Sequence, residues 1–398
     1  MTCSTKTGRL LLVTGNEGRY SLWSMKSDGS EQRKLVEAES GITLQSARWS
    51  PAGDAVYYFR KGGDTTELMR LPLSGDSQRP SVLVSGLEAG DYFTLSADGS
   101  QLAYTRDLAY SNLWSVDLPG TGSSLQPRAT QLTSGTLLYA DPAISPDSRS
   151  VAVTRGSDVK GSVYTMALDS GQQVQLTSFG AARTWSPAWS PDGRQIAFVS
   201  DQAGSEKVWV VSSSGGPARV LDETNASDTD DLLTWSPNPY LIYPARELHN
   251  LRRLNIETQE EASLLPKDSD GWLGYKPTVS PDGKTIAIGW NRVEGFGAWL
   301  ITGEGASASL LYAGVVPFGW SSDGNFIYAF DIREREGREI LQLKLGESKK
   351  PRPVIALAGP ILSGTVSPDG RKIIVSVGEE KSDVWLLEDF DPESARAN

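Results

Sequence analysis

Short apolar stretches alternate with polar turns along the whole sequence, and their composition predicts β-strands. A representative stretch, QIAFV at 195–199, is followed by a polar turn and then by KVWVV at 207–211. Such stretches are rich in Val, Ile, Tyr, Trp and Thr and are bounded by Gly, Pro, Asp or Ser, which is typical of strands. None shows the 3.6-residue period of an amphipathic helix. The pattern predicts an all-β protein.

A pentapeptide of the type WSPDG recurs through the chain at a nearly constant interval. Its copies are WSPAG 49–53, LSADG 95–99, ISPDS 144–148, WSPDG 189–193, WSPNP 235–239, VSPDG 279–283, WSSDG 320–324 and VSPDG 366–370. Successive serines of these copies lie 41 to 49 residues apart. This period is typical of four-stranded propeller blades.

Each repeat has the same internal order, which we denote A, B, C and D. Strand A leads into the pentapeptide, strand B follows it, and a polar turn leads to strand C. The predicted B strands are 10–14, 55–59, 101–105, 150–154, 195–199, 240–244, 285–289, 326–330 and 372–376. The predicted C strands are 21–25, 67–71, 112–116, 162–166, 207–211, 250–254, 297–301, 339–343 and 383–387. Because the B strands are nearly continuous apolar runs, we expect sheets that are covered on both faces.

The pentapeptide itself is explained by turn chemistry. Proline presets φ, aspartate bonds nearby amides, and glycine takes the positive-φ corner between strands A and B. The large residue before the serine, such as Trp189 or Trp320, is predicted to pack between neighbouring blades. WSPNP and ISPDS lack the Asp-Gly corner, so their turns must be built differently.

The repeats predict one domain over residues 1–398, a single closed β-propeller of four-stranded antiparallel blades. Nine B–C hairpins predict nine blades, with a first blade that lacks A and a last blade that lacks D. Eight blades is the alternative, and it would leave one hairpin outside the ring. The predicted blades span 7–40, 44–85, 90–134, 139–178, 184–223, 229–265, 273–313, 314–358 and 361–390.

The repeat at 186–222, SPAWSPDGRQIAFVSDQAGSEKVWVVSSSGGPARVLD, resembles the TolB-type, WD-like propeller repeat. The resemblance extends from about Gly8 to Phe390. It implies a bacterial interaction or sensor module that acts in the periplasm, either free or as the C-terminal part of a receptor kinase or transcriptional regulator. The ending SDVWLLEDFDP at 382–392 is similar to the last blade of such receptor-attached propellers.

Charge and composition exclude several classes of protein. The 398 residues carry a formal net charge of −11, which argues against nucleic-acid binding because phosphates would not be neutralised. A single cysteine, Cys3, excludes an internal disulfide framework. No run of 18 apolar residues is present, so no membrane insertion is expected. The start, MTCSTKTGRLLLVTG, lacks a signal-peptide pattern and favours a chain cut from a longer protein.

The sequence offers no recognised catalytic motif, which predicts that the chain is not an enzyme. The one histidine, His249, cannot supply a multi-histidine metal site, and no Gly-x-Ser-x-Gly elbow is present. Acidic runs at 222–231 and 268–270 do not match a calcium-loop spacing and read as solvated loops. We therefore expect no metal and no cofactor.

Recognition is predicted on the face of the ring that carries the D–A and B–C loops. These loops are aromatic and irregular, which is typical of recognition surfaces. The first-choice contacts are Asp91, Trp185, Asp231 and Tyr275, and the second choices are Tyr92, Tyr139, Trp272 and Phe318. The alternative for each aromatic residue is simple packing between blades.

Three functions are compatible with these features. The first is a monomeric binding or scaffold propeller that recognises a protein or peptide. The second is an enzyme that acts on a saccharide or small ligand in the channel, with Asp91 and Asp231 as acid and base. The third is a structural ring without a ligand.

Overall fold

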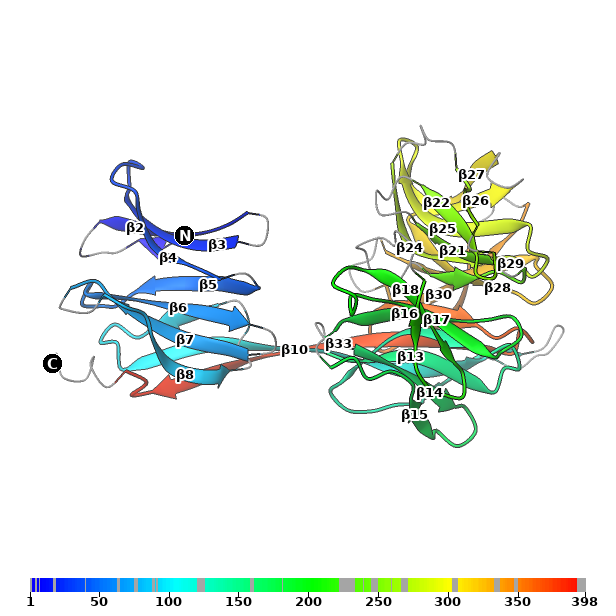
Figure 1. Cartoon of the computed structure of the whole chain (residues 1–398), viewed down its shortest axis with the longest axis horizontal. Helices are drawn as coiled ribbons and strands as arrows, with labels where there is room; N and C mark the ends of the chain where they lie inside the picture. Colours follow the sequence, from blue (N-terminus) through cyan, green and yellow to red (C-terminus); the bar gives the residue numbers. More distant parts are fainter. Residues whose placement is uncertain are drawn as a thin grey trace. The chain divides into compact units, whose positions relative to one another are not determined.

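The computed structural model is built from β-strands throughout its described part. It describes residues 2–391 except 4–5, 7, 17–18, 40, 63–64, 75–77, 88–89, 91, 120–125, 158–160, 181, 222–232, 239, 245–249, 259, 266–270, 303–306, 333–336 and 347–349. All elements in the described residues are strands, which confirms the all-β class. The chain divides into two compact units, unit 1 with residues 1–108 and 380–398, and unit 2 with residues 109–379 (Figure 1).

Five sheets of unit 2 are consecutive four-stranded antiparallel sheets. They are β12(Leu138–Ile144) to β15(Gln173–Gln175) with β13(Ser150–Gly156) and β14(Gly161–Ala167); β16(Thr184–Trp189), β17(Gln195–Ser200), β18(Lys207–Ser212) and β19(Arg219–Val220); β20(Thr234–Trp235), β21(Tyr240–Pro244), β22(Leu251–Asn255) and β23(Glu261–Ser263); β24(Trp272–Val279), β25(Thr285–Arg292), β26(Gly295–Thr302) and β27(Ser307–Ala313); and β28(Val315–Trp320), β29(Phe326–Asp331), β30(Glu339–Lys344) and β31(Arg352–Ala356).

The sixth sheet of unit 2 joins strands from distant parts of the sequence. Its order is β11-β10-β33-β32, with β10(Gln101–Asp117), β11(Arg128–Gln131), β32(Ile361–Val366) and β33(Lys372–Glu388). The Lys372 ammonium forms an ion pair with Asp117, and the Tyr110 hydroxyl donates to Glu379 at 2.6 Å. These pairs fix an antiparallel register between β10 and β33, which lie side by side in Figure 1.

Every sheet of unit 2 packs between two others. Strand β17 shows the principle, because Ile196 and Phe198 join one apolar cluster while Ala197 and Val199 join the next. In β33, Ile374 packs with residues of β13, whereas Ile373 and Val375 pack with residues of β29. The first strands also contact one another in the order β12, β16, β20, β24, β28 and β32, and β32 contacts β12.

Unit 1 contains three sheets of the same kind. They are β1(Thr2–Cys3), β2(Arg9–Asn16), β3(Arg19–Lys26) and β4(Arg33–Glu37); β5(Ile42–Trp49), β6(Ala55–Gly62), β7(Thr65–Pro72) and β8(Ser81–Leu87); and β9(Phe93–Leu95) with the first part of β10 and the last part of β33. The middle sheet is covered on both faces, since Val56 and Tyr58 of β6 pack towards β2 and β3 while Tyr57 and Phe59 pack towards β9 and β10.

The end of the chain fastens the third sheet of unit 1 to the second. Asp391 is 1 % exposed and forms an ion pair with Arg70 at 2.9 Å. The same carboxylate accepts a hydrogen bond from the Tyr57 hydroxyl at 2.6 Å, and Phe390 packs edge-on against the Tyr57 ring. A charge this deeply buried is stable only when it is paired and hydrogen-bonded, which is the case here.

Two of the nine predicted B–C hairpins do not form. The segments 101–105 and 112–116 belong to one continuous strand, β10, and the segments 372–376 and 383–387 belong to β33. The predicted blades 90–134 and 361–390 therefore exchange strands. The segment TRDLAYSN at 105–112 contains neither glycine nor proline, so it is compatible with a continuous strand. The other seven predicted hairpins are present in the described residues.

This exchange changes the predicted architecture. The sequence predicts one domain with nine blades in one ring, whereas the structure has eight sheets in two compact units. The five-stranded sheet of β9, β10, β11, β32 and β33 extends through both units, so that, counted once in each, unit 1 has three sheets and unit 2 has six. The four-stranded antiparallel build of the repeats is as predicted. The predicted count of nine blades in one closed ring is not confirmed.

Candidate functional site

The pentapeptide turns of unit 2 are built around a buried serine hydroxyl. Ser145 donates to Asp147 Oδ1 at 2.6 Å and accepts from the Ser150 amide at 2.9 Å. The same arrangement recurs at Ser190, Ser280, Ser321 and Ser367. In the WSPNP copy, Ser236 instead donates to the carbonyl of Asn238. The hydrogen bond from Ser145 lowers the pKa of Asp147, which keeps that carboxylate ionised and acceptor-only.

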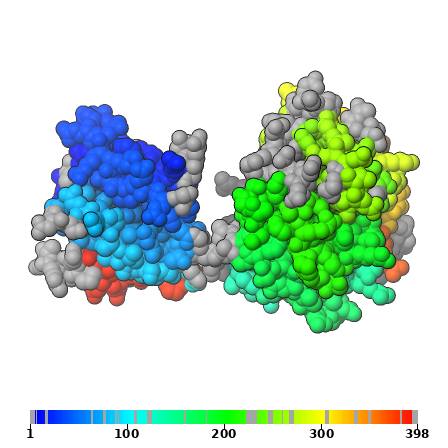
Figure 2. All heavy atoms as spheres, viewed as in Figure 1, coloured from blue at the N-terminus to red at the C-terminus, as the bar shows by residue number. Residues whose placement is uncertain are grey.

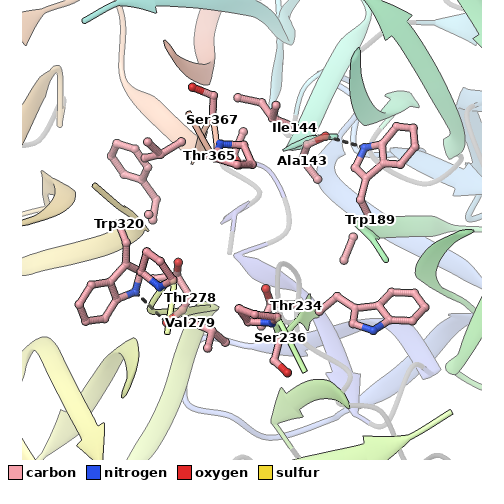
Figure 3. A pocket seen from close by; sticks show the side chains of 18 of the residues that line it. Ala143, Ile144, Trp189, Thr234, Ser236, Thr278, Val279, Trp320, Thr365 and Ser367 are labelled. Carbon is pink, nitrogen blue, oxygen red and sulfur yellow. Dashed lines mark hydrogen bonds between the residues drawn. The ribbon is translucent and has the colours of Figure 1, made fainter. Parts of the chain in front are cut away.

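These turns surround a cavity that has a volume of about 370 Å³ (Figure 3). Its wall takes residues from the first strand and the following turn of all six sheets of unit 2. The lining residues drawn and labelled in Figure 3 are Ala143, Ile144, Trp189, Thr234, Ser236, Thr278, Val279, Trp320, Thr365 and Ser367. The turn prolines at 146, 191, 237, 281 and 368 complete the rim.

Two tryptophans at this rim donate hydrogen bonds to the sheet that precedes their own in the chain. The Trp189 indole donates from Nε1 to the Ala143 carbonyl at 2.9 Å, and Trp320 donates to the Thr278 carbonyl at 3.1 Å. Figure 3 shows these two rings on opposite sides of the cavity. The prediction that the pentapeptide tryptophans pack between neighbouring sheets is therefore confirmed for both, and each adds a directional hydrogen bond.

The cavity wall is almost free of charge. Among the described residues that line it, Lys276 is the one charged side chain. Its ammonium group donates to the Pro187 carbonyl at 3.0 Å. Lys276 lies on β24 and Pro187 on β16, and β20 comes between these two first strands in the order of contacts. The remaining lining residues are apolar or carry hydroxyl groups. Such a wall favours apolar contact with a few oriented hydrogen bonds, as ligand pockets generally do.

A smaller cavity, of about 20 Å³, shares Lys276, Phe318 and Gly364 with the first. Tyr275, Val316 and Leu362 also line it. Aromatic rings pack tightly here, because Tyr275 lies edge-on to Phe330 at 6.2 Å and Phe318 stacks on Phe330 at 6.3 Å. Two of the predicted contacts, Tyr275 and Phe318, therefore line one cavity, which is too small for a peptide.

The inner strands bulge where they pass these cavities. Asp141 and Ser186 have positive φ angles of 56° and 54°, in the left-handed region that costs energy for residues other than glycine. Asp141 Oδ2 accepts from the Ser186 amide at 2.9 Å, and Ser186 Oγ accepts from the Leu233 amide at 2.9 Å. The Asp141 amide in turn donates to Ser363 Oγ at 3.1 Å. These hydrogen bonds connect β32, β12, β16 and the residue just before β20, which are consecutive in the order of first strands.

The other predicted contacts divide into buried and exposed residues. Trp185 and Tyr139 are 4 % and 5 % exposed and lie in inter-sheet clusters, so their alternative role as packing residues is the one observed. Trp272 is 43 % exposed and packs on Phe296, while Tyr92 is 67 % exposed in unit 1. Phe318 lines both cavities.

Asp91 and Asp231 lie outside the described residues, as do His249 and the acidic runs at 222–231 and 268–270. The described residues beside Asp91 belong to unit 1, and those beside Asp231 belong to unit 2. Within the described part of the chain, no group of three or more His, Cys, Asp or Glu side chains is placed to hold a metal ion.

Sequence analysis treated the pentapeptide turns as architecture alone and predicted recognition on the opposite loops, so it did not consider the cavity at these turns as a candidate site. The available signal was a large apolar residue followed two positions later by a proline, in five of the six copies in unit 2. These residues line a cavity where the six turns come together. The sequence did not indicate that Lys276 lines a cavity, because a single lysine on a predicted strand is common.

Comparison with known proteins identifies the repeat. Residues 94–302 match the family model of the TolB β-propeller domain, PD40, and this match spans more than half of the chain. The chain belongs to the TolB β-propeller family. A 265-residue stretch is 27 % identical to the uncharacterised protein Atu1656 of Agrobacterium fabrum, which covers 61 % of this chain and 83 % of that protein. A crystal structure of TolB from Acinetobacter baumannii aligns with 94 % of this chain and 80 % of that chain, at 15 % identity and a TM-score of 0.44.

Other relatives of this TolB-family chain are named as peptidases. Tricorn protease homolog 1 of Streptomyces coelicolor is 24 % identical over 74 % of this chain, and the peptidase YuxL of Bacillus subtilis is 29 % identical over 37 % of it. The alignments cover 23 % of each of those two proteins. The sequence-based prediction that the chain is not an enzyme is contradicted by these relatives. In the described residues, no helix is long and apolar enough to cross a membrane.

Proposed function

We propose that unit 2 is a closed six-bladed propeller that binds an extended peptide segment of a protein partner. The proposed site is the cavity surrounded by the six pentapeptide turns. Closure is supported by the order of contacts, since each of six sheets packs between two others and β32 contacts β12. Exchange of β10 and β33 supports it further, because the two ends of unit 2 share one sheet.

The observation that carries the proposal is the wall of the 370 Å³ cavity. Its indole rings, prolines and hydroxyl groups provide flat apolar surfaces with scattered hydrogen-bonding groups. Polypeptide backbone with alternating apolar side chains fits such a wall, whereas a highly charged ligand would meet Lys276 alone among the described lining residues. The peptidase names of several relatives point to the same ligand class, polypeptide. Membership of the TolB β-propeller family supports a periplasmic location for this activity.

A cavity-filling variant tests this proposal. Thr365 lies on β32 and lines the cavity, so Thr365→Trp should occupy the space without breaking a strand. Thr302→Trp is the matched control, because Thr302 is exposed at the end of β26 and lies outside the cavity lining. The probe is a dodecapeptide selected from a random phage library on the unaltered chain, with affinity measured by calorimetry.

Thr365→Trp should weaken binding of that peptide by at least about tenfold, while Thr302→Trp should leave it unchanged. Equal binding by the two variants would exclude the cavity as the site. Thermal unfolding followed by circular dichroism checks that both variants fold. A selection that enriches no peptide on the unaltered chain would refute peptide binding itself.

A further inference from the structure

Unit 1 has two open ends. Its first sheet packs on the middle sheet through Leu11 and Leu22, and its third sheet packs there through Leu102 and Tyr104. Propellers close with about four to eight blades, so three sheets are too few to close a ring. The outer faces of the first and third sheets are consequently uncovered by any sheet of unit 1.

Both outer faces are apolar. On the first sheet, Leu10 and Leu12 of β2 lie opposite Met25 and Trp23 of β3, and all four are half-buried and belong to no cluster of the described core. We call this set the β2–β3 face. On the third sheet, Val384 and Leu386 of β33 are 76 % and 52 % exposed. With Ala103 and Thr105 of β10 they form what we call the β10–β33 face. Figure 2 shows atoms of both end sheets, in dark blue and red, at the surface of unit 1.

Strands in equivalent positions elsewhere in the chain are covered on both sides. Residues 55–59 of β6 and 196–200 of β17 are buried without interruption, whereas Leu11 is the one buried side chain among residues 9–15 of β2. The sequence LLLV at 10–13 nevertheless has the same continuous apolar character as those covered strands. A chain retains such a run where something covers it, since large exposed apolar faces mark interaction sites.

The two faces also differ in charge. Strands β2 to β4 carry five cationic residues, Arg9, Arg19, Lys26, Arg33 and Lys34, and the acidic Glu37. Glu31 in the turn between β3 and β4 forms ion pairs with Arg9 and Lys26, and Lys34 pairs with Glu37, so only a small positive excess remains on this sheet. The last part of β33 and the residue after it expose Asp383, Glu388 and Asp389. The border of the β2–β3 face is therefore more positive than that of the β10–β33 face. Surfaces whose borders differ in this way complement one another.

We propose that unit 1 pairs with unit 1 of a second copy of this chain, so that two three-sheet halves complete one six-sheet ring. The β2–β3 face of each copy packs against the β10–β33 face of the other. A two-fold axis makes both contacts equivalent, and it closes the assembly because no face remains open. Six sheets is also the number found in unit 2. This inference is independent of peptide binding in unit 2.

Oligomeric state is the first test. Sedimentation velocity of the full chain at micromolar concentration should give a particle of twice the 43.0 kDa chain mass. A monomer, which the sequence-based expectation favoured, would overturn the proposal and indicate that both faces are covered within one chain. Open-ended polymers would overturn it too, because a two-fold pair leaves nothing to extend.

Complementation between two variants gives the sharper test. Leu12→Asp disables the β2–β3 face and Val384→Asp disables the β10–β33 face, so either variant alone should be monomeric because both equivalent contacts are lost. When the two variants are mixed, the intact β10–β33 face of the Leu12→Asp chain can pack against the intact β2–β3 face of the Val384→Asp chain. A mixed pair therefore retains one of the two contacts. The mixture should therefore form a heterodimer, at least about tenfold weaker than the unaltered dimer.

Val293→Asp is the matched control, because Val293 is 86 % exposed on unit 2 and should leave the dimer intact. Circular dichroism confirms folding of each variant, and Val384→Asp is the safer of the two since its side chain is already largely in solvent. A mixture that stays monomeric would refute the pairing of these two faces. Dimers of either single variant would refute it equally.

Discussion

The two units apply one repeat to different numbers of sheets. In unit 2, each B strand divides its side chains between two apolar clusters, as Ile327 and Tyr328 of β29 do. In unit 1, only the middle B strand does so, while β2 is covered on one side. The repeat therefore specifies a blade with two apolar faces. Whether both faces are buried depends on how many blades come together.

Strand exchange separates the two units. Because β10 and β33 run straight where hairpins were predicted, each contributes its two halves to sheets of different units. The same serine turn serves both units, since Ser96 donates to Asp98 in unit 1 as Ser145 does to Asp147 in unit 2. The turns therefore do not distinguish three sheets from six.

The largest expected loss of stability comes from truncating one buried phenylalanine in the core of each unit, in separate variants. Phe59 on β6 and Phe198 on β17 are both 0 % exposed, and truncation of either to alanine should cost about 3–5 kcal/mol through lost burial and a residual cavity. Phe59→Ala should destabilise unit 1 alone and Phe198→Ala unit 2 alone. Hydrogen exchange measured by peptide mass spectrometry reports each unit. A uniform loss of protection over the whole chain in either variant would contradict two separate units.

A cross-strand disulfide tests the exchange directly. The Asp389 amide donates to the Ser100 carbonyl, so the adjoining residues Gln101 and Glu388 form a non-hydrogen-bonded pair, whose Cα atoms are typically about 4.5 Å apart. That separation suits a disulfide. In a Cys3→Ser background, Gln101→Cys/Glu388→Cys should oxidise and stabilise the chain by about 2–4 kcal/mol, as read by non-reducing electrophoresis and urea unfolding.

The matched control is Gln101→Cys/Val116→Cys, a pair that the predicted hairpin 101–105/112–116 would bring together. In one continuous β10 these residues are far apart, so the control should stay reduced. Oxidation of the control pair with no oxidation of the first pair would restore the hairpins and, with them, the nine-bladed ring.

The smallest effect concerns the serine turns and their pH dependence. The hydrogen bond from Ser96 is the main cause that lowers the pKa of Asp98, to about 2. A carboxyl group whose pKa is lower in the folded state stabilises the fold at pH values above its unfolded-state pKa, which is near 3.8. This contribution is lost as the pH falls through the folded-state pKa. Ser145→Ala should cost about 1 kcal/mol at pH 7, and Ser96→Ala less, because the Ser96 bonds are more exposed.

Urea unfolding from pH 7 down to pH 2 should show each difference from the unaltered chain shrinking as the aspartate becomes protonated. A difference that stays constant with pH would show that the hydroxyl acts through the backbone amide alone. A larger loss for Ser96→Ala than for Ser145→Ala would contradict the ranking by burial.

Much of the local structure could be predicted from the chain alone. Seven hairpins, the serine turns and the role of Trp189 and Trp320 follow from apolar runs and turn residues that act over a few positions. The candidate site was harder to predict from the sequence. Tyr275 and Phe318 do line a cavity, but Trp185 and Tyr139 are packing residues, because an aromatic residue beside a turn has the same local pattern in either role.

The sequence by itself determined that this chain forms four-stranded antiparallel sheets joined by serine-centred turns, because strand period and turn chemistry are local properties. Only the tertiary structure decided which strands share a sheet and how many sheets each compact unit contains. Strands β10 and β33 are more than 250 residues apart in the chain, and their pairing satisfies backbone groups that two local hairpins would satisfy equally well. The choice between them rests on the packing of whole sheets, which no short segment encodes.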